Sequence, residues 1–366
     1  LPLSMASAQP ANEAPTFNEH IVPIVFKNCA ACHRPGEVGP FPLLEYKDVR
    51  KRGKLIAEVT QSRQMPPWHA APGHGEFLNE QRLTDEQIAL IRRWVEAGMP
   101  EGDAAKLPKA PTFTDGWQLG PPDLVVTMDK AYEVPATGRD VYRNFVLPLN
   151  LTEEKYVTAV EIRPSARNVV HHILIFQDKS GKARNRVTGG QPGFTNPGFA
   201  FTLGEPITSW AGGSQAQHRP LGLAVPLAKS ADLVLQTHFH PSGKVEQEKT
   251  TVGLYFAKQK PARTLVSFEA PPFFATSAGI NIPAGKKDYK VRGNFKIPVD
   301  VEVVSVSGHA HLVCESMKAT AKLPDGTTKS MIYIPKWDFN WQREYIYKEP
   351  VKLPKGTIVD VEIIYN

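Results

Sequence analysis

The chain has 366 residues, of which 41% are hydrophobic, 33 are proline and 27 are glycine, and its formal net charge is +6. This length predicts two or three domains, and the composition is typical of a loop-rich and strand-rich soluble protein. The basic residues are dispersed, which argues against a nucleic-acid partner, and no stretch reaches the roughly 20 apolar residues of a membrane span.

The first residues resemble the end of a secretory signal. Ala6-Ser7-Ala8 matches the A-x-A pattern of small residues at signal cleavage sites, and residues 1–15 show no helical or strand periodicity. We therefore expect 1–15 to be a leader or signal remnant. Such a segment favours a bacterial periplasmic or exported protein.

Helical patterns follow over residues 16–103. Thr16-Phe-Asn-Glu19 has the form of a capping box and predicts the start of a helix, and a second helix is expected around 46–62. A third helix opens at Thr84-Asp-Glu-Gln87, a further capping box, and Gly98 is placed to end it. Short helices of this kind are typical of a small all-α domain.

Cys29-Ala-Ala-Cys32-His33 has the spacing of a covalent c-type haem attachment site. One turn of chain presents both thiols to the two porphyrin vinyl groups, and the following histidine can then bind the iron. A C-x-x-C redox pair would not need the histidine, and no second C-x-x-C exists to complete a zinc site. The motif favours haem c attached through Cys29 and Cys32, with His33 as an axial ligand, in a cytochrome c domain over 16–103.

The leading candidate for the second axial ligand is Met65. It lies in a loop that two prolines stiffen, Gln64-Met-Pro-Pro-Trp68, which suits a thioether held at a fixed distance from iron. Met99, His69 and His74 are rivals. Met99 is better explained as a packing contact after the third helix, and the two histidines as exposed residues of a Gly/Pro-rich loop.

Beyond a proline-rich linker at 104–122, strand-like runs are separated by Gly, Pro and Asn in two series that meet near residue 260. The expected fold is an all-α cytochrome c domain followed by two all-β antiparallel sandwiches of jelly-roll type, over 123–260 and 261–366. The predicted strands are Leu124–Thr127, Tyr156–Ile162, Val169–Phe176, Ala231–Phe239, Thr251–Phe256, Tyr289–Phe295, Val301–Val306, Met317–Ala321, Met331–Ile334 and Ile358–Ile364.

Histidines gather in three strand-like places. Histidines that are two residues apart on a strand point their imidazoles to the same face. His238 with His240, and His309 with His311, have this spacing. The adjacent His171-His172 would face opposite sides of a regular strand, so both reach one ion only where the strand ends or bulges. A single histidine of this kind is ordinarily a satisfied core residue, but three clusters in apolar surroundings favour metal.

The donor types narrow the choice of metal. Thiolates are missing and nearby carboxylates are few, so imidazoles suit copper or zinc better than calcium or magnesium. A haem in the same chain favours a redox-active metal and therefore copper. A zinc hydrolase would leave the haem without a role, and the sequence holds no H-E-x-x-H motif to supply a general base.

The histidine series resembles that of the copper type II, ascorbate-dependent monooxygenases, the family of peptidylglycine α-hydroxylating and dopamine β-monooxygenase. The resemblance covers about 121–366, and the N-terminal part is similar to small c-type cytochromes fused to this unit in some bacterial members. It implies two sandwich domains and two copper ions. One is an electron-transfer copper on His171, His172 and His238, and the other is an oxygen-activating copper on His309 and His311.

Two departures from the family pattern matter. No Glu-Met element that would supply a methionine follows the H-x-H in this sequence, so either the sequence is trimmed or another ligand takes its place. Met317 is a candidate because an unbroken strand would place it on the face of His309 and His311. A core methionine is an equally good explanation. Ser307 stands where members that bind a peptide carboxylate carry arginine, which argues against a peptidylglycine substrate.

The remaining residues of this kind receive structural roles. His240 is assigned to the second shell of the electron-transfer copper, and Cys314 and Met331 to packing. His218 is taken as an ordinary loop histidine. These assignments leave no further residue for acid–base chemistry.

The function that we expect is a copper-dependent monooxygenase. It would hydroxylate a C–H bond of a small organic substrate with O2, using electrons delivered by the fused haem and, before it, by a periplasmic donor. The alternative is a non-catalytic haem and copper protein that carries electrons or binds copper.

Overall fold

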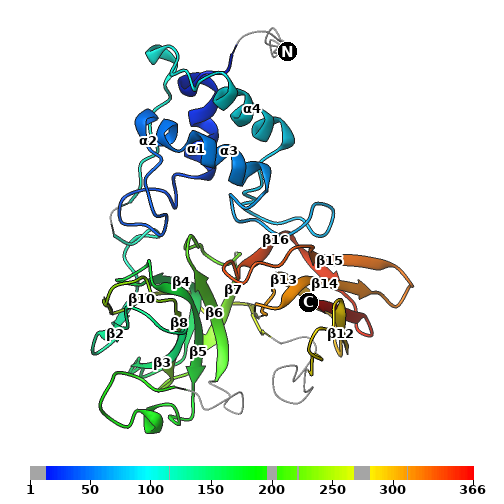
Figure 1. The fold of residues 1–366 in the computed structure, drawn as a ribbon. Helices are drawn as coiled ribbons and strands as arrows, with labels where there is room; N and C mark the ends of the chain where they lie inside the picture. Colours follow the sequence, from blue (N-terminus) through cyan, green and yellow to red (C-terminus); the bar gives the residue numbers. More distant parts are fainter. Residues whose placement is uncertain (1–13, 115, 196–203, 221, 268–280, 311) are drawn as a thin grey trace. The chain divides into compact units, whose positions relative to one another are not determined.

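A computed structural model describes residues 14–114, 116–195, 204–220, 222–267, 281–310 and 312–366 (Figure 1). Internal contacts divide the chain into two units. The N-terminal unit comprises 1–68 and 80–113, and the β unit comprises 69–79 and 114–366. A short stretch of the N-terminal region is therefore part of the β unit, which the expected boundary at residue 103 did not foresee.

The capping box at the last long helix is present as predicted. In α4 (Asp85–Glu96), the Thr84 hydroxyl accepts from the backbone N–H of Gln87, and the Gln87 side-chain oxygen accepts from the N–H of Thr84. Gly98 follows the helix with a φ of 83°, a left-handed conformation that L side chains rarely adopt. Local sequence signals therefore set both ends of this helix.

The first helical segment begins differently from the expected capping box. The Thr16 side chain caps no backbone N–H, because the His20 Nδ1 atom lies 3.1 Å from its backbone nitrogen and 3.2 Å from its hydroxyl. A π-helical turn, η1 (Phe17–Ile21), then leads into α1 (Val22–Asn28), which ends one residue before Cys29.

The helix expected over 46–62 is divided into α2 (Tyr46–Lys51) and α3 (Gly53–Gln61). Apolar side chains of η1, α1, α3 and α4 pack around Trp94, which is fully buried. None of the helices in the described chain is long and apolar enough to cross a membrane.

The predicted fold class is contradicted. The chain is mostly β-strands in several sheets and only 14% helical, and its N-terminal region is not a small all-α cytochrome domain. The helices there are short, and the segments that join them, such as 29–45 and 62–84, are irregular. One of these irregular stretches, at 69–79, is part of the β unit.

The strands form five sheets among the described residues, in the orders β1-β10-β4-β7-β11, β3-β8-β5-β6, β12-β17-β14-β15, β2-β9 and β13-β16. Apart from the two-residue parallel pair of β11 with β7, the pairings are antiparallel. All ten predicted runs fall on strands. The strands are β1 (Leu124–Thr127), β2 (Tyr132–Val134), β3 (Val141–Pro148), β4 (Lys155–Arg163), β5 (Val170–Asp178), β6 (Glu205–Ala211), β7 (Leu223–Leu227), β8 (Asp232–Phe239), β9 (Glu246–Glu248), β10 (Thr251–Phe256), β11 (Arg263–Thr264), β12 (Tyr289–Lys296), β13 (Val301–Ser307), β14 (Cys314–Lys322), β15 (Thr328–Ile334), β16 (Glu344–Leu353) and β17 (Ile358–Tyr365).

Strands β5 and β8 lie at the centre of one four-stranded sheet and carry the first histidines. Their alternate apolar residues, such as Ile173, Ile175, Leu233 and Leu235, are fully buried in a core shared with the five-stranded sheet. Burial fixes the register of such strands, because a slip by one residue would turn the apolar set outward. The histidines at the end of these strands are therefore held by the packing of the whole core.

The segment 69–79 is bound to strands β15 and β16 of the β unit. The Ala71 N–H donates to the Tyr333 carbonyl, the Leu78 N–H to the Ile346 carbonyl, and the Lys348 N–H to the Glu76 carbonyl. Phe77 is buried, with its ring 5.3 Å from that of Tyr345 and 5.0 Å from that of Tyr347. Backbone pairing and aromatic packing together make this segment a structural part of the β unit.

Candidate functional site

Three histidines come together where β5 and β8 begin and end. His172 is the cross-strand partner of His238, and the pairing of β5 with β8 is shifted between Val170 and His172. This irregularity is the bulge that the adjacent His171-His172 pair requires, because it turns both imidazoles toward His238. The sequence thus indicated both the residues and the backbone feature that they need.

The three imidazoles face one another through the same ring nitrogen. Nδ1 of His171 lies 2.8 Å from Nδ1 of His238 and 3.1 Å from Nδ1 of His172. All three rings can place a donor atom within 4.8 Å of the others. Nitrogen lone pairs this close repel unless a proton or a cation lies between them, so the arrangement fits a metal held by three neutral imidazoles.

Burial keeps the cluster in the form that binds metal. His172 and His238 are buried, and His171 is half-buried. Desolvation lowers the pKa of His171 below its ordinary value, against smaller opposing effects of Asp140 and the Asn340 backbone. A lowered pKa favours the neutral ring, which has a free lone pair for a metal at neutral pH.

Aromatic rings enclose the cluster. The Phe339 ring lies 4.9 Å from that of His171, nearly parallel to it, and 5.4 Å from that of His238. Tyr142, the cross-strand partner of His238, stacks on the latter at 4.1 Å with an angle of 11° between the rings. These contacts restrict the orientation of the imidazoles and limit the access of water to them.

Asp140 is a member of the site that sequence reasoning missed. Its carboxylate lies 2.7 Å from Nε2 of His238 and 2.8 Å from Nδ1 of His240. Burial raises the pKa of Asp140, but the hydrogen bonds from His240 and His238 outweigh it and the pKa falls below the usual value. The register between the strands points to Asp140: on the facing strand Tyr142 pairs with His238, and Asp140 is two residues before Tyr142. That register was not predictable, because β3 itself was not.

His309 lies in a loop and not on a strand. Strand β13 ends at Ser307 and β14 begins at Cys314, so no unbroken strand joins His309 to Met317. His309 is described, and its ring lies 6.2 Å from that of His172. His311 lies outside the described residues.

Met317 lies beside this loop for a different reason from the one expected. It is buried on β14, and a Cβ atom added at Gly308 would lie 2.6 Å from its sulfur. The thioether is therefore packed against the residue that precedes His309. A side chain at position 308 would displace the Met317 sulfur, and the contact places the thioether next to the residue before His309.

Other residues take structural roles. Met331 is buried on β15, and its carbonyl accepts from the Tyr347 hydroxyl. Cys314 is buried, and burial raises the pKa of its thiol to about 12, so it is an inert packing residue. His218 is exposed, with its ring 5.6 Å from that of Tyr255.

Cys29, Cys32 and His33 lie in a turn that follows α1. The N–H groups of Cys32 and His33 both donate to the Cys29 carbonyl. Nδ1 of His33 lies 3.0 Å from the Phe41 carbonyl, which accepts its proton and leaves Nε2 as the nitrogen for iron. Burial raises the pKa of the Cys29 thiol to about 12.

Gly39 packs closely against this turn. A Cβ atom there would lie 2.7 Å from the Cys32 carbonyl oxygen and 2.8 Å from Nδ1 of His33. The hydrogen bond to His33 and the lack of a side chain at Gly39 fit the orientation of an axial histidine. These contacts orient the His33 ring, and haem attachment at Cys29 and Cys32 remains a prediction from the sequence.

The four candidates for the second axial ligand of the haem lie in two different units. Met65 is half-buried in the N-terminal unit, and its N–H donates to the Val59 carbonyl. The Met99 sulfur packs against Gly53, and the side chain is partly buried against the core of the N-terminal unit. His69 and His74 belong to the β unit, where Nδ1 of His74 lies 2.7 Å from the Ser330 hydroxyl. Met65 remains the preferred candidate.

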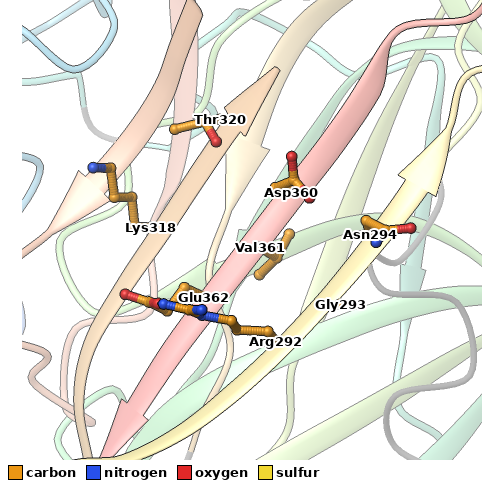
Figure 2. A pocket seen from close by; sticks show the side chains of 8 residues that line it. All are labelled: Arg292, Gly293, Asn294, Lys318, Thr320, Asp360, Val361 and Glu362. Carbon is orange, nitrogen blue, oxygen red and sulfur yellow. The ribbon is translucent and has the colours of Figure 1, made fainter. Parts of the chain in front are cut away.

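A hollow lies on strands β12, β14 and β17 of the sheet β12-β17-β14-β15, and its lining differs from that of the histidine cluster (Figure 2). Figure 2 shows charged and polar side chains around it, including the ion pair of Arg292 with Glu362. None of the predicted ligands lines it, so we do not assign it to the metal site. Its lining residues are Arg292, Gly293, Asn294, Lys318, Thr320, Asp360, Val361 and Glu362.

The chain was compared with known proteins. No family model matches it, and no curated protein is significantly similar to it. The resemblance to the copper monooxygenases therefore remains an expectation based on the histidine series.

Proposed function

We propose that the protein is a copper-dependent monooxygenase whose electrons come from a covalently attached haem. The observation that carries the proposal is the meeting of three imidazole Nδ1 atoms of His171, His172 and His238 in a buried place. Such a donor set suits copper or zinc, and a haem attachment motif in the same chain favours the redox-active metal. The bound copper would store and transfer one electron.

The residues around the cluster would hold its geometry. The three ligands are on two paired strands, so their spacing is set by the backbone. Phe339 and Tyr142 stack on the imidazoles and keep them from turning. A rigid and largely dry ligand set lowers the reorganisation needed when a metal changes oxidation state.

A second copper would be held by His309, His311 and the thioether of Met317. The support is the contact of the Met317 sulfur with Gly308, directly before His309. The His309 and His172 rings are 6.2 Å apart, which leaves electrons a short path between the two groups. This metal would activate O2.

The haem would be attached through Cys29 and Cys32, with His33 and Met65 as axial ligands. Haem supplies one electron at a time to the coppers. The overall reaction would be R–H + O2 + 2 electrons + 2 protons → R–OH + H2O, with a small organic substrate and a periplasmic electron donor.

The test starts from the full chain produced in a host that attaches c-type haem. We expect a Soret band, about two copper ions per chain by metal analysis, and copper-dependent reoxidation of the reduced haem by O2. Incorporation of 18O from 18O2 into a panel of small organic compounds identifies hydroxylation. Absence of covalent haem, or zinc in place of copper, would refute the proposal.

A second candidate is a non-catalytic electron carrier or copper-binding protein. It is favoured by the difference between the two metal groups: among the described residues, only His171, His172 and His238 form a group of three such ligands. One copper per chain without consumption of O2 would establish this alternative. His309→Ala is the deciding variant, because it should abolish oxygen use by an enzyme and leave a carrier unaffected.

A further inference from the structure

We infer that Asp140 is a positioning residue that fixes the proton of His238 on Nε2 and so turns the lone pair of Nδ1 toward the metal. The inference deepens the proposed function, on which it rests for the presence of a metal. Asp140 is just before β3, which pairs with β8, the strand that carries His238. It touches the ligand from the side opposite the cluster.

The contacts define the proton positions. One carboxylate oxygen lies 2.7 Å from Nε2 of His238, and the other lies 2.8 Å from Nδ1 of His240. An ionised carboxylate can only accept hydrogen bonds, so both ring nitrogens that face it carry a proton. A neutral His238 with its proton on Nε2 has its lone pair on Nδ1.

That lone pair points into the cluster. Nδ1 of His238 is the atom 2.8 Å from Nδ1 of His171. The other tautomer would place a hydrogen on Nδ1, where it would occupy the position of a metal, and would leave Nε2 without a donor for Asp140. The carboxylate therefore selects the one neutral form of His238 that can bind a metal at this place.

The two histidines differ in what they contribute. The His238 side chain is completely buried, whereas that of Asp140 is 31% exposed, so water can reach their bond only from the side of the carboxylate. The His240 side chain is 73% exposed, so its pairing with Asp140 contributes little to stability. His240 instead occupies the second carboxylate oxygen, which holds the plane of the carboxylate toward His238. The expected second-shell role of His240 thus acts through Asp140.

The direct test reads the tautomer in metal-free protein. The full chain is labelled with 15N-histidine, and long-range 1H–15N spectra are recorded at neutral pH, with the His238 signals assigned by their loss in His238→Asn. We expect the wild-type His238 to carry its proton on Nε2. A proton on Nδ1 in the wild type would overturn the inference, and this result does not depend on metal binding.

The second test measures copper affinity. Asp140→Asn should weaken copper binding at the cluster by roughly 10- to 100-fold, the range typical of second-shell partners. Its spectrum should also show a mixture of His238 tautomers, because an amide can present either its oxygen or its nitrogen. His240→Gln should have a smaller effect, and Asp129→Asn, an exposed aspartate before β2, is the matched control.

These outcomes separate the two ideas. If the wild type binds no copper although His238 is protonated on Nε2, the proposed function fails and the positioning role of Asp140 stands. If the wild type binds copper and Asp140→Asn binds it equally well with an unchanged tautomer, the inference fails and the proposed function stands.

Discussion

The two groups of candidate ligands are held in different ways. His171, His172 and His238 lie on paired strands in the middle of a sheet, with a bulge that directs two neighbouring side chains to one point. His309 lies in the loop between β13 and β14, and the Met317 sulfur reaches that loop from the following strand. One group is fixed by sheet register and the other by loop packing.

If the proposed function holds, this difference would fit two separate roles for the two metals. A ligand set fixed by backbone pairing keeps its geometry through a change of charge, which suits transfer of an electron. A set built on a loop can open a coordination position for O2 and leave space for a substrate. The following four changes test this comparison, from the largest expected effect to the smallest.

Removing a strand-held ligand should have the largest effect. His238→Ala deletes one of three nitrogen donors from a buried cluster, and we expect copper affinity there to fall about 1000-fold, or about 4 kcal/mol. Competition with a copper chelator measures the change. A second copper at His309 should still bind, and loss of both metals together would contradict the separate construction of the two groups.

Substitution of the methionine beside the loop should have an intermediate effect. Met317→Leu conserves volume and should cost less than about 1.5 kcal/mol of folding stability, while copper affinity at the His309 group falls about tenfold. Met331→Leu is the matched control, because Met331 is equally buried on the neighbouring strand. Equal copper affinity in both variants would show that Met317 is a core residue only.

The pH dependence of metal binding should be shifted toward acid. Burial lowers the pKa of His171 below its ordinary value of 6.5, so the neutral ring persists to lower pH than in an exposed histidine. Copper affinity at the cluster should begin to decrease at a lower pH than it would for exposed histidine ligands, because protons compete for the ligands only near the lowered pKa. A titration of bound copper against pH measures this, and a decrease beginning above pH 7 would contradict it.

Replacement of the aromatic ring over the histidine cluster should have the smallest effect on copper affinity. Phe339→Leu keeps an apolar side chain but removes the ring that stacks on His171. We expect copper affinity to change by less than about threefold, or about 0.7 kcal/mol, and the copper spectrum to broaden because the ligand orientations vary more. An unchanged spectrum would show that the strand pairing alone orients the ligands.

The sequence predicted the parts of the molecule that depend on local pattern. Alternation marked ten strands, and Thr84 with Gln87 and Gly98 marked both ends of α4. The requirement for a bulge followed from two adjacent histidines on one strand. In each case the interaction lies within a few residues of the chain, so it can be read from spacing.

What could not be predicted depends on contacts between distant residues. Asp140 joins the site because of the register between β3 and β8, and β3 has no regular alternation. The Met317 sulfur packs against Gly308, the residue before His309, whereas strand alternation had suggested that Met317 shares a face with His309 and His311. The prediction of an all-α domain was wrong for a similar reason. Local pattern identifies short helices, but it does not show which unit the loops between them bind to.

The insertion of 69–79 into the β unit has a consequence for anyone who would divide this protein. A shortened version that starts after residue 113 would lack the phenyl ring of Phe77 and leave a hole between Tyr345 and Tyr347. Loss of a buried phenyl group of this size typically destabilises a protein by about 3–5 kcal/mol. A stable β unit therefore needs residues 69–79 as well as 114–366.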